Sequence, residues 1–239
     1  GAAGDFAGGS VRIDTRRVPN KLTLAGSLSL GFNTQATFAE YLTYDGGSWD
    51  WLGIDDGTRS LPDEIPSSKV VRGVEDEHGE LITRERIARY GEALNTSMSP
   101  YRSVGPPNHG GNFVVANSWP IKDWGRVGVM AALVYDRRFE RRLDGTIRNY
   151  RLGAEGEADL VDGLSRTNDL GYERGTDKVS WGALGALTLE IGDEHTITLT
   201  GLHTRASDKD VSVMDGFHKE RQARVHDTRM TFVSRSLTF

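Results

Sequence analysis

Four aromatic residues near a pair of glycines are the side chains best suited to bind a small ligand. They are Tyr41, Tyr44, Trp49 and Trp51. Aromatic rings on a glycine-rich loop can stack on a sugar, a siderophore or a peptide, because each ring combines a large apolar surface with a polar handle. The same rings can instead pack the loop against itself, and the sequence leaves both interpretations open.

The ionisable residues show no spacing typical of a catalytic centre. The six histidines stand at positions 78, 109, 195, 203, 218 and 226. No two of them have the i, i+4 spacing of a metal pair on a helix. The chain has no cysteine, which excludes thiolate zinc sites, disulfides and cysteine nucleophiles. We therefore expect no enzyme, no cofactor and no resident metal.

Two kinds of charged cluster have both a functional and a simpler interpretation. Asp55 and Asp56, and the group Asp208, Asp210 and Asp215, offer oxygen ligands for a divalent cation, but their spacing is not that of an EF-hand loop. The arginines at 137, 138, 141 and 142 could contact lipopolysaccharide phosphates, since guanidinium groups suit phosphate geometry. In both cases solvated surface charge is the alternative.

Composition excludes several classes of protein. The 239 residues carry a net charge of -5 and include 29 glycines, which disfavours a helical bundle. Basic residues are scattered, so the chain offers no basic face for nucleic acid. No apolar run approaches the ~20 residues that a membrane-spanning helix needs.

Alternation of apolar and polar residues predicts six strands, and hence an all-β fold. In the first, Leu22, Leu24, Leu28 and Leu30 share one face, while Thr23, Ser27 and Ser29 share the other. The segments are 21–32, 112–119, 127–139, 179–191, 195–205 and 229–239.

The connections between these strands alternate in length. Those at 120–126 and 192–194 are short enough for hairpins, whereas those at 34–111, 140–178 and 206–228 are long. This alternation is typical of transmembrane β-barrels, in which periplasmic turns are short and extracellular loops are long. Within the first long connection, the spacing of apolar residues over 70–94 predicts a short helix with Thr83 as its N-cap.

Six strands are too few for a closed barrel, because the smallest barrels have about eight. An open sheet edge cannot face lipid, since its backbone groups would lack hydrogen-bond partners. Either two strands lack the alternating pattern, or the chain supplies part of a larger barrel.

The segment Gly8-Gly9-Ser10-Val11-Arg12-Ile13-Asp14-Thr15-Arg16 resembles the Gly-x-Val-x-Ile-x-Thr-Lys/Arg strand that ends the plug domain of TonB-dependent outer-membrane receptors. In that family the first barrel strand follows directly, as the segment 21–32 does here. The resemblance continues through 44–47, 50–59, 179–185 and 202–208.

This resemblance implies two regions: the end of a plug domain at 1–20, and about the first six strands of a large plugged barrel with long extracellular loops at 21–239. It also implies a location in the outer membrane of a Gram-negative bacterium. The expected activity is the capture of an extracellular ligand and its import across that membrane. The expected partners are the TonB energy-coupling complex, the remaining strands and plug of the same receptor, and outer-membrane lipid.

A soluble, secreted β-rich module that binds carbohydrate is the alternative. In that case Trp49 and Trp51 would form the stacking platform. Solubility without detergent separates the two hypotheses, because lipid-facing rows of leucine and valine cannot stay exposed to water.

Overall fold

The computed structural model describes residues 21–94, 99–154, 160–192, 194–219 and 222–239. The plug-end segment expected at 1–20 lies outside these residues. Strands dominate what is described, which confirms the prediction of an all-β fold.

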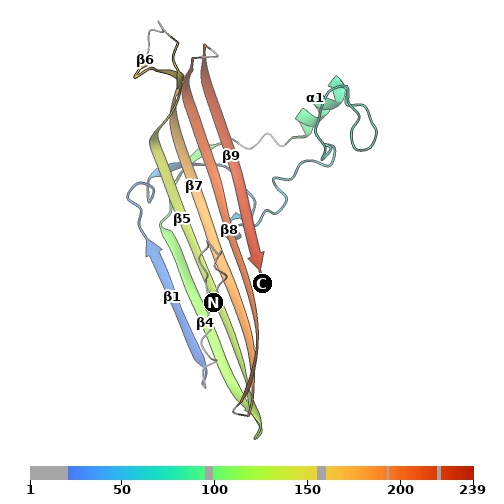
Figure 1. Cartoon of the computed structure of the whole chain (residues 1–239), viewed down its shortest axis with the longest axis vertical. Coiled ribbons are helices and arrows are strands. Elements are labelled where there is room, and N and C mark those ends of the chain that lie inside the picture. The colour runs from blue at the N-terminus through green and yellow to red at the C-terminus, as the bar shows by residue number, and fades with distance from the viewer. Residues whose placement is uncertain (1–20, 95–98, 155–159, 193, 220–221) are drawn as a thin grey trace.

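The main sheet is antiparallel and tall (Figure 1). Its principal strands lie in the order β1-β4-β5-β7-β8-β9, and the short β6 pairs with β7. Their bounds are Thr23–Gly31 (β1), Asn108–Ile121 (β4), Gly125–Leu152 (β5), Leu160–Val161 (β6), Leu164–Ile191 (β7), His195–His218 (β8) and Ala223–Thr238 (β9). Across the described residues the sheet is open, with β1 and β9 at its two edges.

Two of the three long connections predicted from the sequence are wrong. Most of 140–178 and 206–228 continues the strands, so that β5 and β7 each contain 28 residues and β8 contains 24. Ion pairs between neighbouring strands, such as Arg148 with Asp169 at 2.9 Å, bind these extensions together. Polar residues occur on both faces of the extensions, so the apolar alternation that marks a strand ends before the strand does.

The first long connection is confirmed as an insertion between two strands of the sheet. It contains β2 (Glu40–Thr43), the 3₁₀ turn η1 (Asp50–Leu52), α1 (Arg84–Ala93) and β3 (Tyr101–Val104), and β2 pairs with β3. The predicted helix cap is also confirmed, since the Thr83 hydroxyl accepts a hydrogen bond from the Arg86 amide at 3.3 Å. Figure 1 shows α1 projecting away from the main sheet.

A small buried cluster lies where the first connection meets the sheet. Leu42 and Tyr44 from the connection pack against Val211 of β8, with Val213 and Met230 at its border. In the part of the chain that the structure describes, no helix is long and apolar enough to cross a membrane.

Candidate functional site

One face of the sheet carries a continuous band of exposed apolar side chains. Residues that pair directly across an antiparallel ladder project to the same side, so the register assigns each side chain to a face. The lowest row of the band is Trp119, Val127, Leu189 and Ile197, and the next is Asn117, Val129, Leu187 and Leu199. Two further rows lie above these. The first contains Leu24, Val115 and Ala131, and the second contains Phe113, Leu133 and Ala183.

The band contains no Asp, Glu, Lys or Arg in these four rows. Its side chains are uncovered in the described structure: Leu28, which continues it on β1, is 95% exposed, and Leu199 is 71% exposed. We call this surface the apolar face.

Aromatic residues mark both borders of the band. Trp119 lies in its lowest row, and Tyr135 pairs with Trp181 one row above Leu133. The two border rows lie eight residues apart on β5, from Val127 to Tyr135, or about 26 Å along the strand at ~3.3 Å per residue.

The opposite face has a different composition at the same height. Its two lowest rows are Ser118, Gly128, Thr188 and Thr198, and Thr23, Ala116, Met130, Ala186 and Thr200. Above them lie an apolar row, Ala25, Val114, Ala132, Leu184 and Leu202, and then Ser27, Asn112, Val134, Gly182 and Thr204. The register thus confirms the predicted alternation of the first strand, because Leu24 and Leu28 lie in the apolar rows and Thr23 and Ser27 in the opposite ones.

Immediately above the band, residues 44–59 of the first connection lie against the apolar face; we call them the docked loop. Three consecutive carbonyl oxygens of this loop accept hydrogen bonds from successive strands. Tyr135 of β5 donates to Trp51 at 2.8 Å, and Trp181 of β7 donates to Leu52 at 2.8 Å. The Gly53 carbonyl accepts from Arg205 of β8 at 3.3 Å and from Ser234 of β9 at 2.6 Å. The docked loop therefore crosses the strands along the upper border of the band.

Two glycines permit this close approach. Gly53 has a φ of 66°, and a Cβ atom there would collide with the Ser207 hydroxyl of β8. A Cβ atom on Gly175 of β7 would collide with the backbone carbonyl of Leu42 in β2. Any larger residue at these positions would push the first connection off the sheet.

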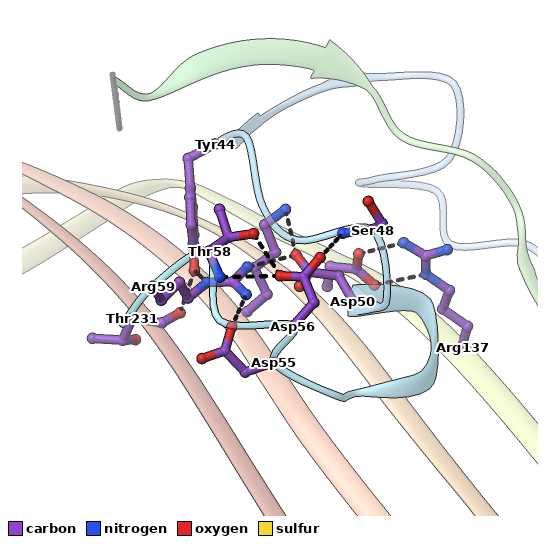
Figure 2. Close-up of polar contacts among 11 residues, drawn as sticks. Tyr44, Ser48, Asp50, Asp55, Asp56, Thr58, Arg59, Arg137 and Thr231 are labelled. Atoms are coloured by element: carbon purple, nitrogen blue, oxygen red, sulfur yellow. Dashed lines mark hydrogen bonds and ion pairs between the residues drawn. The ribbon is translucent and has the colours of Figure 1, made fainter. Parts of the chain in front are cut away.

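A polar cluster fastens the docked loop above the apolar band (Figure 2). The Asp50 carboxylate contacts Arg59 at 2.6 Å and Lys209 of β8 at 3.1 Å, and its side chain is only 10% exposed. Arg59 also stacks over the Phe232 ring of β9 at 4.2 Å and donates to the Tyr44 hydroxyl at 3.3 Å. We call these residues the latch.

The ionisation of the latch follows from its contacts. Burial acts to raise the pKa of Asp50, but hydrogen bonds from Arg59 and Lys209 outweigh it and leave that pKa below its ordinary value. Burial raises the pKa of Tyr44, so its hydroxyl stays protonated and donates to the Thr231 carbonyl at 3.3 Å. The ionised Asp50 therefore pairs with two cations, and these ion pairs hold the docked loop on the sheet.

The structure separates the four predicted ligand-binding aromatics into two pairs. Tyr41 is 7% exposed and packs edge-to-face on Phe139 of β5, and Tyr44 is 2% exposed within the latch. Their rings therefore hold the first connection on the sheet and present no stacking surface. Trp49 and Trp51 are 51% and 50% exposed, and their role in binding a ligand stays a prediction.

The four arginines predicted as a cluster do not lie together. Two of them pair with carboxylates, and the other two line a groove. Arg137 forms a double hydrogen bond with the buried Asp177, at 3.0 and 2.6 Å, and this bond raises its pKa. Arg138 pairs with Asp136 at 2.6 Å. Arg141 and Arg142 line an open groove of about 1030 Å³ beside the edge of β5. They are the two members that remain candidates for a phosphate.

Four of the five predicted carboxylates contact other groups of the protein. Asp56 accepts from the Ser48 amide at 2.7 Å, and Asp55 contacts Arg59 at 3.3 Å. Asp210 and Asp215 pair with Arg174 and Arg224, respectively. Among the residues that the structure describes, no group of three or more His, Asp or Glu side chains is arranged to hold a metal ion.

Sequence reasoning missed Arg59, Lys209 and Gly175. Arg59 and Lys209 lie 150 positions apart, so only the fold brings them to the same carboxylate. Gly175 occurs in a segment predicted to be a loop, where a glycine carries no signal of close packing.

Comparison with known proteins gave no match to a family model, to a curated protein or to a solved structure. The function is therefore argued from the geometry and from the resemblance noted in the sequence.

Proposed function

We propose that this chain forms part of the β-barrel of a TonB-dependent outer-membrane receptor, with the apolar face toward lipid. The observation that carries the proposal is the apolar band, which is free of charged residues and bordered by aromatic residues above and below. A strand tilted in a membrane crosses it in ~9–11 residues. The four charge-free rows and the border row of Tyr135, which also contains Arg205 of β8, together occupy nine residues of β5. Aromatic residues at both borders match the girdles of outer-membrane barrels.

The asymmetry of the strands supports the same proposal. Below the band, β7 and β8 are joined by a connection of only three residues, 192–194. Above it, β5 continues 17 residues past Tyr135, or about 56 Å, with polar residues on both faces. Long structures on one side and short turns on the other are typical of barrels that present a large surface outside the cell.

The open edges of the sheet require partners in a membrane. Unpaired backbone groups on β1 and β9 would cost several kcal/mol each in hydrocarbon. We infer that further strands of the receptor pair with both edges and that a plug fills the interior. Import of an extracellular ligand, energised through TonB, follows from the sequence resemblance.

Flotation on a density gradient tests the membrane assignment. Cells that express the chain are fractionated, and their outer membranes are washed with urea and floated. We expect the chain to rise with the lipid and to need detergent for extraction. Recovery of a monodisperse protein without detergent would contradict the proposal and favour the carbohydrate-binding module.

The transport role has a separate test. A strain that lacks the chain should lose uptake of at least one nutrient, and removal of TonB from the parent strain should cause the same loss. Uptake that persists without TonB would exclude this mechanism while leaving the membrane location intact.

A further inference from the structure

The docked loop runs parallel to the upper border of the apolar band. Its carbonyl oxygens at Trp51, Leu52 and Gly53 bond to β5, β7 and β9 in turn, close to the row that holds Tyr135 and Trp181. A segment that crosses the strands at this height would lie along the membrane surface if the band lies in the membrane.

Exposed aromatic rings gather along this border. The Trp51 ring lies 6.5 Å from the ring of Tyr135 and remains 50% exposed, and the neighbouring Trp49 is 51% exposed. Trp51 therefore extends the aromatic border of the strands with a ring supplied by the loop.

A second pair of rings occurs at the top of β1. Phe32 follows Leu28 and Leu30 in the alternation of the first strand, and its ring lies 6.1 Å from that of Phe38. The two rings are 66% and 69% exposed. Phe38 has a φ of 60°, a conformation that is costly for a bulky residue and is fixed here by a hydrogen bond from its amide to the Gly105 carbonyl at 2.8 Å.

We propose that Phe32, Phe38, Trp49 and Trp51 form a collar that binds the headgroup region of the outer leaflet. This inference rests on the membrane location proposed above and adds a lipid-binding role for the first connection. Tryptophan prefers the membrane interface, because its ring is apolar and its N-H is polar. The occupant is the lipid surface, since the collar is continuous with the band that lipid would cover.

The hydrogen bonding of the docked loop fits such a position. Backbone carbonyls near hydrocarbon need donors from the protein, because little water is present. The carbonyls of Trp51, Leu52 and Gly53 have such donors in Tyr135, Trp181 and Ser234. The charged latch residues Asp50 and Arg59 pair with each other, which suits them to a place close to the membrane surface.

The same geometry separates these tryptophans from the interior of the barrel. Trp51 lies on the apolar face, whereas the interior would be lined by the opposite face, which carries Ser29 and Thr200. A ligand on its way through the receptor would therefore pass the other side of the sheet. Binding of a soluble ligand by Trp51 is the competing outcome of the test.

Depth-dependent fluorescence quenching tests the collar in the intact protein. The chain has no cysteine, so a single Cys introduced at Trp51, at Ala131 in the middle row of the band or at Gly79 in the first connection carries a fluorescent label at one site. The labelled chain, assembled with the remaining strands of its receptor, is placed in phosphatidylethanolamine vesicles whose acyl chains carry bromine near the headgroup end or near the methyl end. Iodide in the buffer reports exposure to water.

We expect the label at Trp51→Cys to lose most of its fluorescence with shallow bromine and little with deep bromine. The label at Ala131→Cys should be quenched by deep bromine, and that at Gly79→Cys by iodide alone. If Ala131→Cys is quenched by bromine while Trp51→Cys responds only to iodide, the collar is refuted and the membrane location stands. If Ala131→Cys also responds only to iodide, the membrane location itself fails, and the collar with it.

Discussion

The Tyr135 hydroxyl donates a 2.8 Å hydrogen bond to the Trp51 carbonyl oxygen and so joins the strand row that borders the apolar band to the loop above it. Trp181, which pairs with Tyr135 across the sheet, makes the equivalent bond to Leu52 at 2.8 Å. Tyr135 and Trp181 therefore have two structural roles. Their rings mark the edge of the apolar face, and their polar atoms position the first connection.

Replacement of Gly175 should detach the first connection from the sheet. In Gly175→Ala the new methyl group would collide with the Leu42 carbonyl, and such overpacking typically costs ~1–3 kcal/mol. We expect faster hydrogen exchange in residues 40–59. The matched control is Gly185→Ala on the same strand, where a Cβ atom meets nothing within 4 Å. Equal effects of the two substitutions would show that β2 does not dock as described.

Removal of the Asp50 charge should open the latch. Asp50→Asn leaves Arg59 and Lys209 without their shared carboxylate, and loss of one partner from a buried pair costs roughly 3 kcal/mol. Asp55→Asn is the control, because Asp55 also contacts Arg59 but its side chain is 39% exposed. That variant should change the stability of the loop by less than about 1 kcal/mol. Hydrogen exchange of residues 44–59 measures both effects.

The docked loop should also respond to acid. The pKa of Asp50 in the folded protein lies below its ordinary value of 3.8, so the contribution of its charge is complete above about pH 4. That contribution is lost as the pH falls through the lowered, folded pKa, because protonation then removes the ion pair. Opening of the loop should therefore occur below about pH 4 and be absent from Asp50→Asn. A transition between pH 6 and pH 8 would point to a different group.

Insertion of an epitope tag tests on which side each connection lies. Gly79 lies in the first connection and Gly192 in the turn between β7 and β8, and a Cβ atom meets nothing within 4 Å at either. Both sites therefore have room for extra residues. In intact cells we expect antibody to bind the tag at Gly79, and to bind the tag at Gly192 only after the outer membrane is opened. The reverse pattern would invert the topology.

The lower part of the sheet could be predicted from the sequence, because the alternation of apolar and polar residues there indicates both the strand and the face on which each side chain lies. Leu24 and Leu28 alternate with Thr23 and Ser27, one face of the strand is apolar, and the pairing with β4 follows that pattern. The upper part lacks this signal. Arg148 and Asp169 stabilise their strands as a cross-strand ion pair, and their charges predict a loop when the chain is considered alone.

The site could be predicted only in part, for a related reason. Trp49 and Trp51 can be chosen as candidates from the sequence, because they are aromatic residues close to two glycines. The burial of Tyr44 depends on Arg59, Lys209 and Val211, and two of these come from a strand more than 150 residues away. Local sequence contains no information on which of the four rings such distant residues will cover.

The most direct measurement compares Leu28→Arg with Ser29→Arg for assembly into the outer membrane. The two residues are adjacent on β1 and both are exposed, so neither substitution causes a collision within the chain, and only the direction of the side chain differs. If the apolar face contacts lipid, arginine at position 28, which lies in the border row of Tyr135, should cost up to about 1 kcal/mol and reduce the amount that floats with urea-washed membranes. Arginine at position 29 should be tolerated. Equal assembly of the two variants would contradict the assignment of the apolar face to lipid.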